Sequence, residues 1–186
     1  RSIISTTITD EWRMMHGANA KIYAVGLHPQ ATVLMAGHAA NACCWLDPTT
    51  QKWVTTSFYS EGLPAAADNM NVSGRIKALI SGYWQPSMNI DQYPLPAGES
   101  SKTDFKYATA DVLLYTPTAN KLVAELALNI QQNDQLGKDD IHDLLLLQLN
   151  TLSPETESDM ITNIQQTDLY YGINKDLGML IDILNQ

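Results

Sequence analysis

The segment from Asp139 to Asp143 brings together side chains that can bind metal ions. It contains three carboxylates and one imidazole, from Asp139, Asp140, His142 and Asp143. Carboxylates and imidazole are common ligands of divalent ions, so a metal site is one interpretation. The segment also lies between a predicted helix and a predicted strand, where a polar connection is expected. Adjacent side chains do not easily converge on one ion, so we predict a connection and no metal site.

His38 follows a predicted helix in a Gly-His turn, where two roles are open. The ring could contact a ligand such as a phosphate, or it could donate a hydrogen bond to a backbone carbonyl. We expect the structural role.

Tyr83 and Trp84 are the aromatic residues with the strongest case for ligand recognition. Most of the aromatic residues fall in predicted core or hairpin segments, where packing is their usual role. This pair instead falls in a stretch without a regular pattern, and exposed rings beside such a stretch are candidates for recognition. The sequence contains no Walker-type loop, Gly-x-Gly-x-x-Gly loop or Gly-x-Ser-x-Gly elbow.

Composition indicates one folded domain over residues 1–186. The chain is 45% hydrophobic and 17% charged, which is typical of ordinary folded proteins. Its net charge of -9 argues against a nucleic-acid surface and against docking on anionic lipid. The longest apolar run, 144–147, is far shorter than the roughly 20 residues of a membrane helix, so we predict no membrane insertion.

The first third of the chain predicts a helix, a strand, a helix and a hairpin. Residues 9–15 suit a short helix capped by Thr9 or Asp10. Alternation over 21–27 predicts a strand, and Pro29 suits the first turn of a helix closed by Gly37. The aromatic runs 42–46 and 53–59 flank an Asp-Pro turn and predict a β-hairpin.

Cys43 and Cys44 are the only cysteines, and both fall in the first predicted hairpin strand. Neighbouring residues of a strand point to opposite faces, so the pair cannot easily form a disulfide. We interpret them as packing residues.

The rest of the chain predicts four further helices and one strand. Helices are expected over 63–70 and 73–81, followed by an irregular surface excursion over 82–106. A long helix is expected from Thr116-Pro117 to Leu136-Gly137. Residues 143–149 are apolar on both faces, which predicts a strand in the middle of a parallel sheet, and a last helix follows. Helices alternating with apolar strands indicate a layered α/β fold.

Several segments, in order, resemble one known family. They are Ser5 to Glu11, Leu34 to Ala42 with the hairpin after it, Tyr115 to Asn120, Leu136-Gly137 with Asp143 and the Leu run, and Asp168 to Leu177. They are similar to the phosphate-irrepressible alkaline phosphatases and to the type I phosphodiesterase and nucleotide pyrophosphatase group of the alkaline phosphatase superfamily. The resemblance implies a partial alkaline-phosphatase-like layered sheet with flanking helices and an aromatic β-hairpin.

The family's chemistry is implied only in part. Its enzymes hydrolyse phosphate esters with two zinc ions and a Thr or Ser nucleophile. The resemblance places the nucleophile before Arg1 and the later Asp-His metal pair after the last helix. We therefore expect a central fragment of a larger protein that is not competent alone and that has no cofactor of its own. A periplasmic or cell-envelope location is implied by the family.

Four positions carry the comparison with the family's active site. The Lys and Arg that hold the phosphoryl oxygens in the family's monoesterases fall on His28 and Gln30, which makes these two residues the substrate-binding candidates. Two of its zinc ligands fall on Ser153 and Glu157, and serine is a poor zinc ligand. Either a gap in the alignment hides the true ligands, or the metal site has been lost.

Two functions therefore stay open. The chain could be a segment of a metal-dependent phosphatase or phosphodiesterase that acts on a small-molecule phosphate ester. The alternative is a degenerate, non-catalytic binding or interaction domain. In either case exposed strand edges and apolar helix faces could let the isolated piece self-associate.

Overall fold

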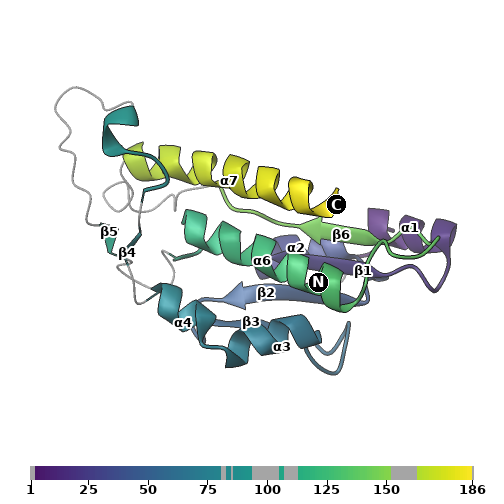
Figure 1. The fold of residues 1–186 in the computed structure, drawn as a ribbon. Coiled ribbons are helices and arrows are strands. Elements are labelled where there is room, and N and C mark those ends of the chain that lie inside the picture. Colours follow the sequence, from purple (N-terminus) through teal and green to yellow (C-terminus); the bar gives the residue numbers. More distant parts are fainter. Residues whose placement is uncertain are drawn as a thin grey trace.

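The computed structural model describes residues 3–80, 83–84, 86–93, 105–106, 113–151 and 163–185. The elements, labelled as in Figure 1, follow in chain order: α1 (Ile8–His16), β1 (Ile22–Gly26), α2 (Pro29–Ala36), β2 (Ala42–Asp47), β3 (Lys52–Val54), α3 (Ala65–Val72), α4 (Arg75–Ile80), β4 (Tyr83–Trp84), η1 (Ile90–Gln92), β5 (Phe105–Lys106), α6 (Pro117–Asn133), β6 (Leu144–Leu147) and α7 (Asn163–Leu184).

The main sheet has four strands in the order β3-β2-β1-β6. Strand β1 pairs in parallel with both neighbours. In this register Val25 lies next to Cys44 of β2 on one side and next to Leu147 of β6 on the other. Strands β2 and β3 form the predicted antiparallel hairpin. Because β1, β2 and β6 run in the same direction, their carboxyl ends meet at one edge of the sheet and their amino ends at the other.

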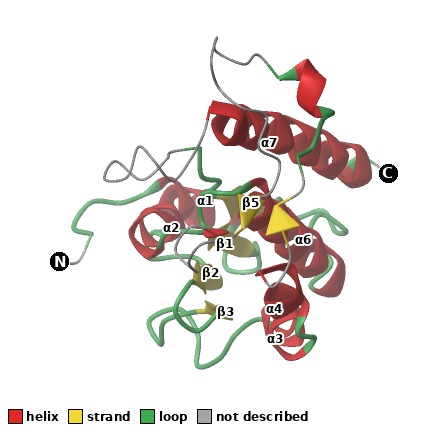
Figure 2. Cartoon of the chain, turned by 90° about the vertical axis from the view of Figure 1, so that its left-hand side faces the viewer, coloured by secondary structure: helices red, strands yellow, loops and turns green. Residues whose placement is uncertain are grey.

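Helices cover both faces of the sheet, as predicted for a layered α/β fold. Figure 2 shows α1 and α2 on one side of the strands and α3, α4 and α6 on the other. The larger core lies on the α6 side and contains Cys44, whereas Cys43 belongs to the smaller core on the α2 side. Both cysteines are free and buried, which confirms their packing role. Helix α7 packs on α6.

The position of β6 differs from the prediction. The strand lies at the edge of the described sheet instead of in its middle, and its four leucines are only half-buried. The apolar pattern arises because α6 contacts the strand on one face and α2 contacts it on the other. A residue pattern reports the faces of a strand and does not report its neighbours along the hydrogen-bonding direction.

Three further features differ from the predictions, namely two element boundaries and one long stretch. Strand β3 stops at Val54, short of the predicted 53–59, and the Thr55 hydroxyl that follows it donates to the Cys43 carbonyl at 2.7 Å. Helix α1 is capped by Thr7 instead of Thr9 or Asp10, and the Asp10 carboxylate accepts the Thr7 N–H at 2.8 Å in a capping box.

The third difference concerns the stretch 82–106, which was predicted to be irregular. Its described part contains short regular elements, namely β4 paired with β5, and η1. A buried carboxylate attaches this region to α7, because Asp168 accepts the Ser87 N–H at 2.8 Å and the Tyr93 hydroxyl at 2.6 Å. Burial raises the pKa of Tyr93 to about 12, and its hydrogen bond to Asp168 acts in the same direction.

Gly37 lets α1 and α2 approach closely. Its φ of +56° lies in the left-handed region, and a Cβ there would overlap the hydroxyls of Thr7 and Thr9. The Thr9 hydroxyl also donates to the Ala36 carbonyl at 2.8 Å, which ties the start of α1 to the end of α2. The junction therefore requires glycine for two separate reasons.

We predict that Gly37→Ala lowers the free energy of unfolding by about 2 to 4 kcal/mol, through backbone strain and overlap together. Gly17→Ala is the matched control, since Gly17 has a φ of +84° but no atom within 4 Å of an added Cβ. It should lose about 1 to 3 kcal/mol from the backbone term alone, and less than Gly37→Ala loses. Urea denaturation measures both losses, and equal losses would contradict the close approach.

Candidate functional site

The carboxyl edge of the sheet is held together by one amide side chain. Gln148 follows β6, and its Oε1 accepts the backbone N–H groups of Leu27 and His28, which follow β1, at 2.7 and 2.9 Å. Its Nε2 donates to the Leu149 carbonyl at 3.0 Å. Two neighbouring strand ends are therefore fixed relative to each other at the edge where α/β sheets bind ligands.

His28 stands at this edge as the N-cap residue of α2. Its carbonyl accepts from the Thr32 N–H at 3.0 Å and from the Thr32 hydroxyl at 2.7 Å. Its ring packs on Tyr115, with the ring centroids 5.9 Å apart and the planes at 52°. Partial burial lowers the pKa of His28, so the imidazole is neutral at pH 7. A neutral ring offers one donor and one acceptor.

Gln30 lies in the first turn of α2 and is exposed. His28 and Gln30 therefore share the N-terminal end of one helix, where backbone N–H groups and the helix dipole favour an anion. Both predicted substrate-binding residues therefore lie at this helix end. Neither side chain carries a permanent positive charge, so the pair can donate hydrogen bonds to an oxyanion without neutralising it.

Two buried asparagines continue this edge, and they were missed by the sequence reasoning, as was Gln148. Asn120 of α6 exchanges two hydrogen bonds with the backbone of Asn150, at 2.8 and 2.9 Å. Asn150 in turn donates from its side chain to the Leu114 carbonyl at 2.9 Å. The signal available in the sequence was a polar residue placed directly after an apolar strand. We infer that these amides position the chain around the site.

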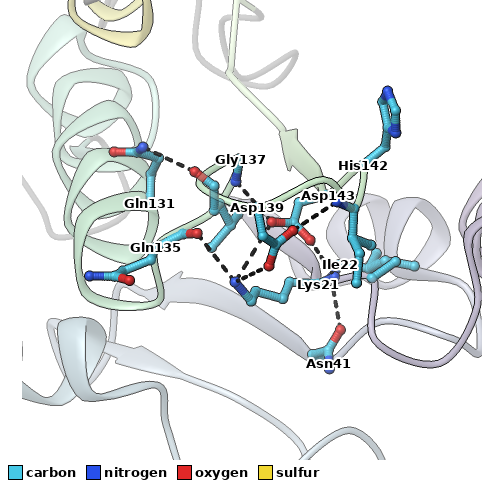
Figure 3. Close-up of polar contacts among 12 residues, drawn as sticks. Lys21, Ile22, Asn41, Gln131, Gln135, Gly137, Asp139, His142 and Asp143 are labelled. Atoms are coloured by element: carbon cyan, nitrogen blue, oxygen red, sulfur yellow. Dashed lines mark hydrogen bonds and ion pairs between the residues drawn. The ribbon is translucent and has the colours of Figure 1, made fainter.

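The opposite, amino edge holds the predicted polar connection, drawn in Figure 3. Asp143 accepts the Lys21 N–H at 2.7 Å and the Gly137 N–H at 2.9 Å. The Lys21 ammonium lies 3.7 Å from Asp139 and 3.9 Å from Asp143. The His142 ring points away from both carboxylates. Protein partners therefore occupy these two carboxylates, and the segment acts as a connection.

The described residues do not fit the two-zinc centre of the family. Among them, no three His, Cys, Asp or Glu side chains come together as a metal-binding group. At the carboxyl edge, His28 has amides and a tyrosine as its neighbours. Ser153 and Glu157 lie outside the described residues, as do the side chains of Tyr83 and Trp84, so these positions stay predictions.

His38 has the structural role expected of it. Its Nε2 lies 3.0 Å from the Ile3 carbonyl and its Nδ1 lies 3.0 Å from Asp10. The hydrogen bond to Asp10 raises the pKa of His38, and the bond to Ile3 adds to this. Partial burial would raise the pKa of Asp10, but hydrogen bonds from His38 and Thr7 outweigh it and lower that pKa to about 2.

The whole chain is similar in sequence to proteins named alkaline phosphatases. No protein-family model matches it. It is 26% identical over 204 residues to the alkaline phosphatase PafA of Elizabethkingia meningoseptica, and 23% identical over 208 residues to the alkaline phosphatase PhoV of Synechococcus elongatus. It is also 23% identical over 206 residues to a calcium-transporting ATPase of Myroides odoratus. All of this chain is covered each time, but only 37% or 38% of the relatives.

Solved structures show the same fold. The crystal structure of wild-type PafA matches 97% of this chain and 38% of its own, with a TM-score of 0.82 and 24% identity. A PafA variant with four substitutions matches with a TM-score of 0.79. The chain is therefore related to the alkaline phosphatase superfamily over a partial segment and has the fold of that segment, as predicted. In the described part of the chain, none of the helices could cross a membrane.

We predict that Gln148→Leu destabilises the protein by about 2 to 3 kcal/mol, because two backbone N–H groups lose their acceptor. Gln148→Glu keeps an acceptor oxygen and should lose less than half as much. Urea denaturation of both variants measures the difference. If both variants unfold alike, the amide does not join the strand ends.

The interaction of His38 with Asp10 predicts a pH-dependent contribution to stability. The folded pKa of His38 is raised, so its contribution is complete below the unfolded value of 6.5 and is lost as the pH rises through the folded pKa. The difference in melting temperature between wild type and His38→Ala should therefore be larger at pH 6 than at pH 8. In an Asp10→Asn background this pH dependence should shrink, and its persistence there would assign the effect to another group.

Proposed function

We propose that this chain forms part of a phosphoric-ester hydrolase, and that the carboxyl edge of its sheet lies against the phosphoryl group of a small-molecule phosphate ester. The observation that carries the proposal is the end-to-end match to proteins named alkaline phosphatases. It is supported by the placement of His28 and Gln30 at a strand end and a helix N-terminus. The chain spans less than two fifths of those relatives, so the activity belongs to a whole protein of their kind.

The two candidate residues suit a phosphate group of low charge. The imidazole of His28, whose pKa is lowered by burial, can donate one hydrogen bond to a phosphoryl oxygen. The side-chain amide of Gln30 and the first turn of α2 can donate further bonds. Lys and Arg, which the family's monoesterases use, would add charge-assisted bonds that favour a dianion. We infer that neutral donors shift preference from monoesters, which carry two charges, towards diesters, which carry one.

The metal dependence of the family is part of the proposal. When bound, zinc would supply charge stabilisation for the nucleophile and the leaving oxygen. The described residues provide no group that fits it, so its ligands would come from other parts of the protein. A location in the periplasm or cell envelope follows from the same resemblance and is proposed on that basis only.

One observation favours a second candidate function, a non-catalytic binding domain. Both positions expected to hold fixed cations carry neutral side chains, and His28 is held neutral by burial. A relative that no longer performs phosphoryl transfer would have no need for concentrated positive charge at this edge. Such a protein would retain the fold and bind a partner or ligand without turnover.

The double substitution His28→Lys with Gln30→Arg tests the placement of the phosphoryl group. In the whole protein that contains this chain, it should raise the ratio of kcat/KM for 4-nitrophenyl phosphate to that for bis(4-nitrophenyl) phosphate by at least about tenfold. The reason is that two new cations at the site would stabilise the dianion more than the monoanion. Steady-state kinetics on both esters measure the ratio.

A matched control adds the same charges at the other edge of the sheet. His142 and Gln132 are exposed, so His142→Lys with Gln132→Arg changes the net charge equally and should leave the ratio unchanged. An equal rise in both variants would reject the proposed placement. If wild type hydrolyses neither ester and metal analysis finds no zinc bound, the binding-domain candidate replaces the hydrolase.

A further inference from the structure

Two histidines that are distant in the sequence lie side by side at the amino edge of the sheet. His16 ends α1 and His142 precedes β6, and their ring centroids are 5.1 Å apart with the planes tilted by 36°. Trp12 also packs on the His16 ring, with the ring centroids 4.4 Å apart, and its indole N–H donates to the His142 carbonyl at 2.9 Å. The tryptophan therefore holds both histidines in place.

We propose that His16 and His142 together bind a divalent late first-row metal ion, such as Cu²⁺, Ni²⁺ or Zn²⁺. Imidazole nitrogens are preferred ligands of these ions. A metal–nitrogen bond of ~2 Å puts the ion about 3 Å from each ring centroid. If the angle between the two metal–nitrogen bonds lies between a right angle and the tetrahedral angle, the two ring centroids are about 4.5 to 5 Å apart. The observed 5.1 Å is close to the upper end of this range.

The electrostatic surroundings favour a cation at this place. His16 lies in the last turn of α1, where the helix dipole presents its negative end. The chain as a whole carries a net charge of -9, which raises the local concentration of cations. The neighbouring Lys21 ammonium is paired with Asp139 and Asp143, so its positive charge is offset there. The His142 ring points away from those two carboxylates, so they are not part of the proposed ligand set.

The site would be open to solvent. His142 is exposed and His16 is half-buried, so an ion can enter without disturbing the fold. No third His, Cys, Asp or Glu joins the pair within the residues that the structure describes, so water would complete the coordination. A bound ion would link the end of α1 to the start of β6 and stabilise the folded state by mass action.

Binding of Cu²⁺ tests the site, because Trp12 provides a local reporter. In the protein that contains this chain, Cu²⁺ should quench the fluorescence of Trp12, and Zn²⁺ should compete and restore it. The electron paramagnetic resonance spectrum of the bound Cu²⁺ should show coupling to two imidazole nitrogens. His16→Ala and His142→Ala should each weaken binding by at least about tenfold and leave coupling to one nitrogen.

Two control variants sharpen the result. His38→Ala removes another exposed histidine, one engaged by Asp10, and should bind Cu²⁺ like wild type. Trp12→Phe keeps a ring against His16 and should lose the quenching while calorimetry still finds the ion. Circular dichroism checks that each variant is folded, and His16→Gln replaces His16→Ala if that variant is not. A one-nitrogen spectrum in wild type, no binding, or an equal loss in His38→Ala would each overturn the proposal.

Discussion

The parallel pairing of β1 on both sides is the constraint on which the rest of the structure depends. The strand lies between β2 and β6, and four of its five residues are buried because helices cover both faces. Its direction decides what meets at each edge of the sheet. His28 and Gln148 meet at the carboxyl edge, while Lys21 and Asp143 meet at the amino edge. Each candidate site in this protein is a consequence of that pairing.

The two edges are held by different chemistry. At the amino edge, an ammonium and two carboxylates pair with one another, and a carboxylate also takes backbone N–H groups. At the carboxyl edge the bonds are made by neutral amides, from Gln148, Asn120 and Asn150. These three amides add no net charge to the described part of this edge. A phosphate group placed there would meet hydrogen-bond donors and a helix dipole, which agrees with the preference for low charge proposed above.

The elements were largely predictable, because local patterns report local structure. Pro29 and Thr116-Pro117 mark two helix starts, and the aromatic runs around Asp47 form the hairpin. Resemblance to the alkaline phosphatase superfamily was also visible in short ordered motifs and is confirmed. The place of β6 was wrong, since leucines on both faces show only that two layers cover a strand. Thr7 was missed as a cap because Thr9 and Asp10 are equally good capping residues by type.

The sequence by itself determined the class of fold, the packing role of Cys43 and Cys44, and the neutral pair His28 and Gln30, because these depend on residue types and short spacings. Only the tertiary structure decided which side chains meet. The contact of His16 with His142, the tie from Gln148 to His28, and the pairing of His38 with Asp10 all join separate segments. Such contacts depend on the order and direction of strands in the sheet, and no short-range pattern in the chain encodes that order.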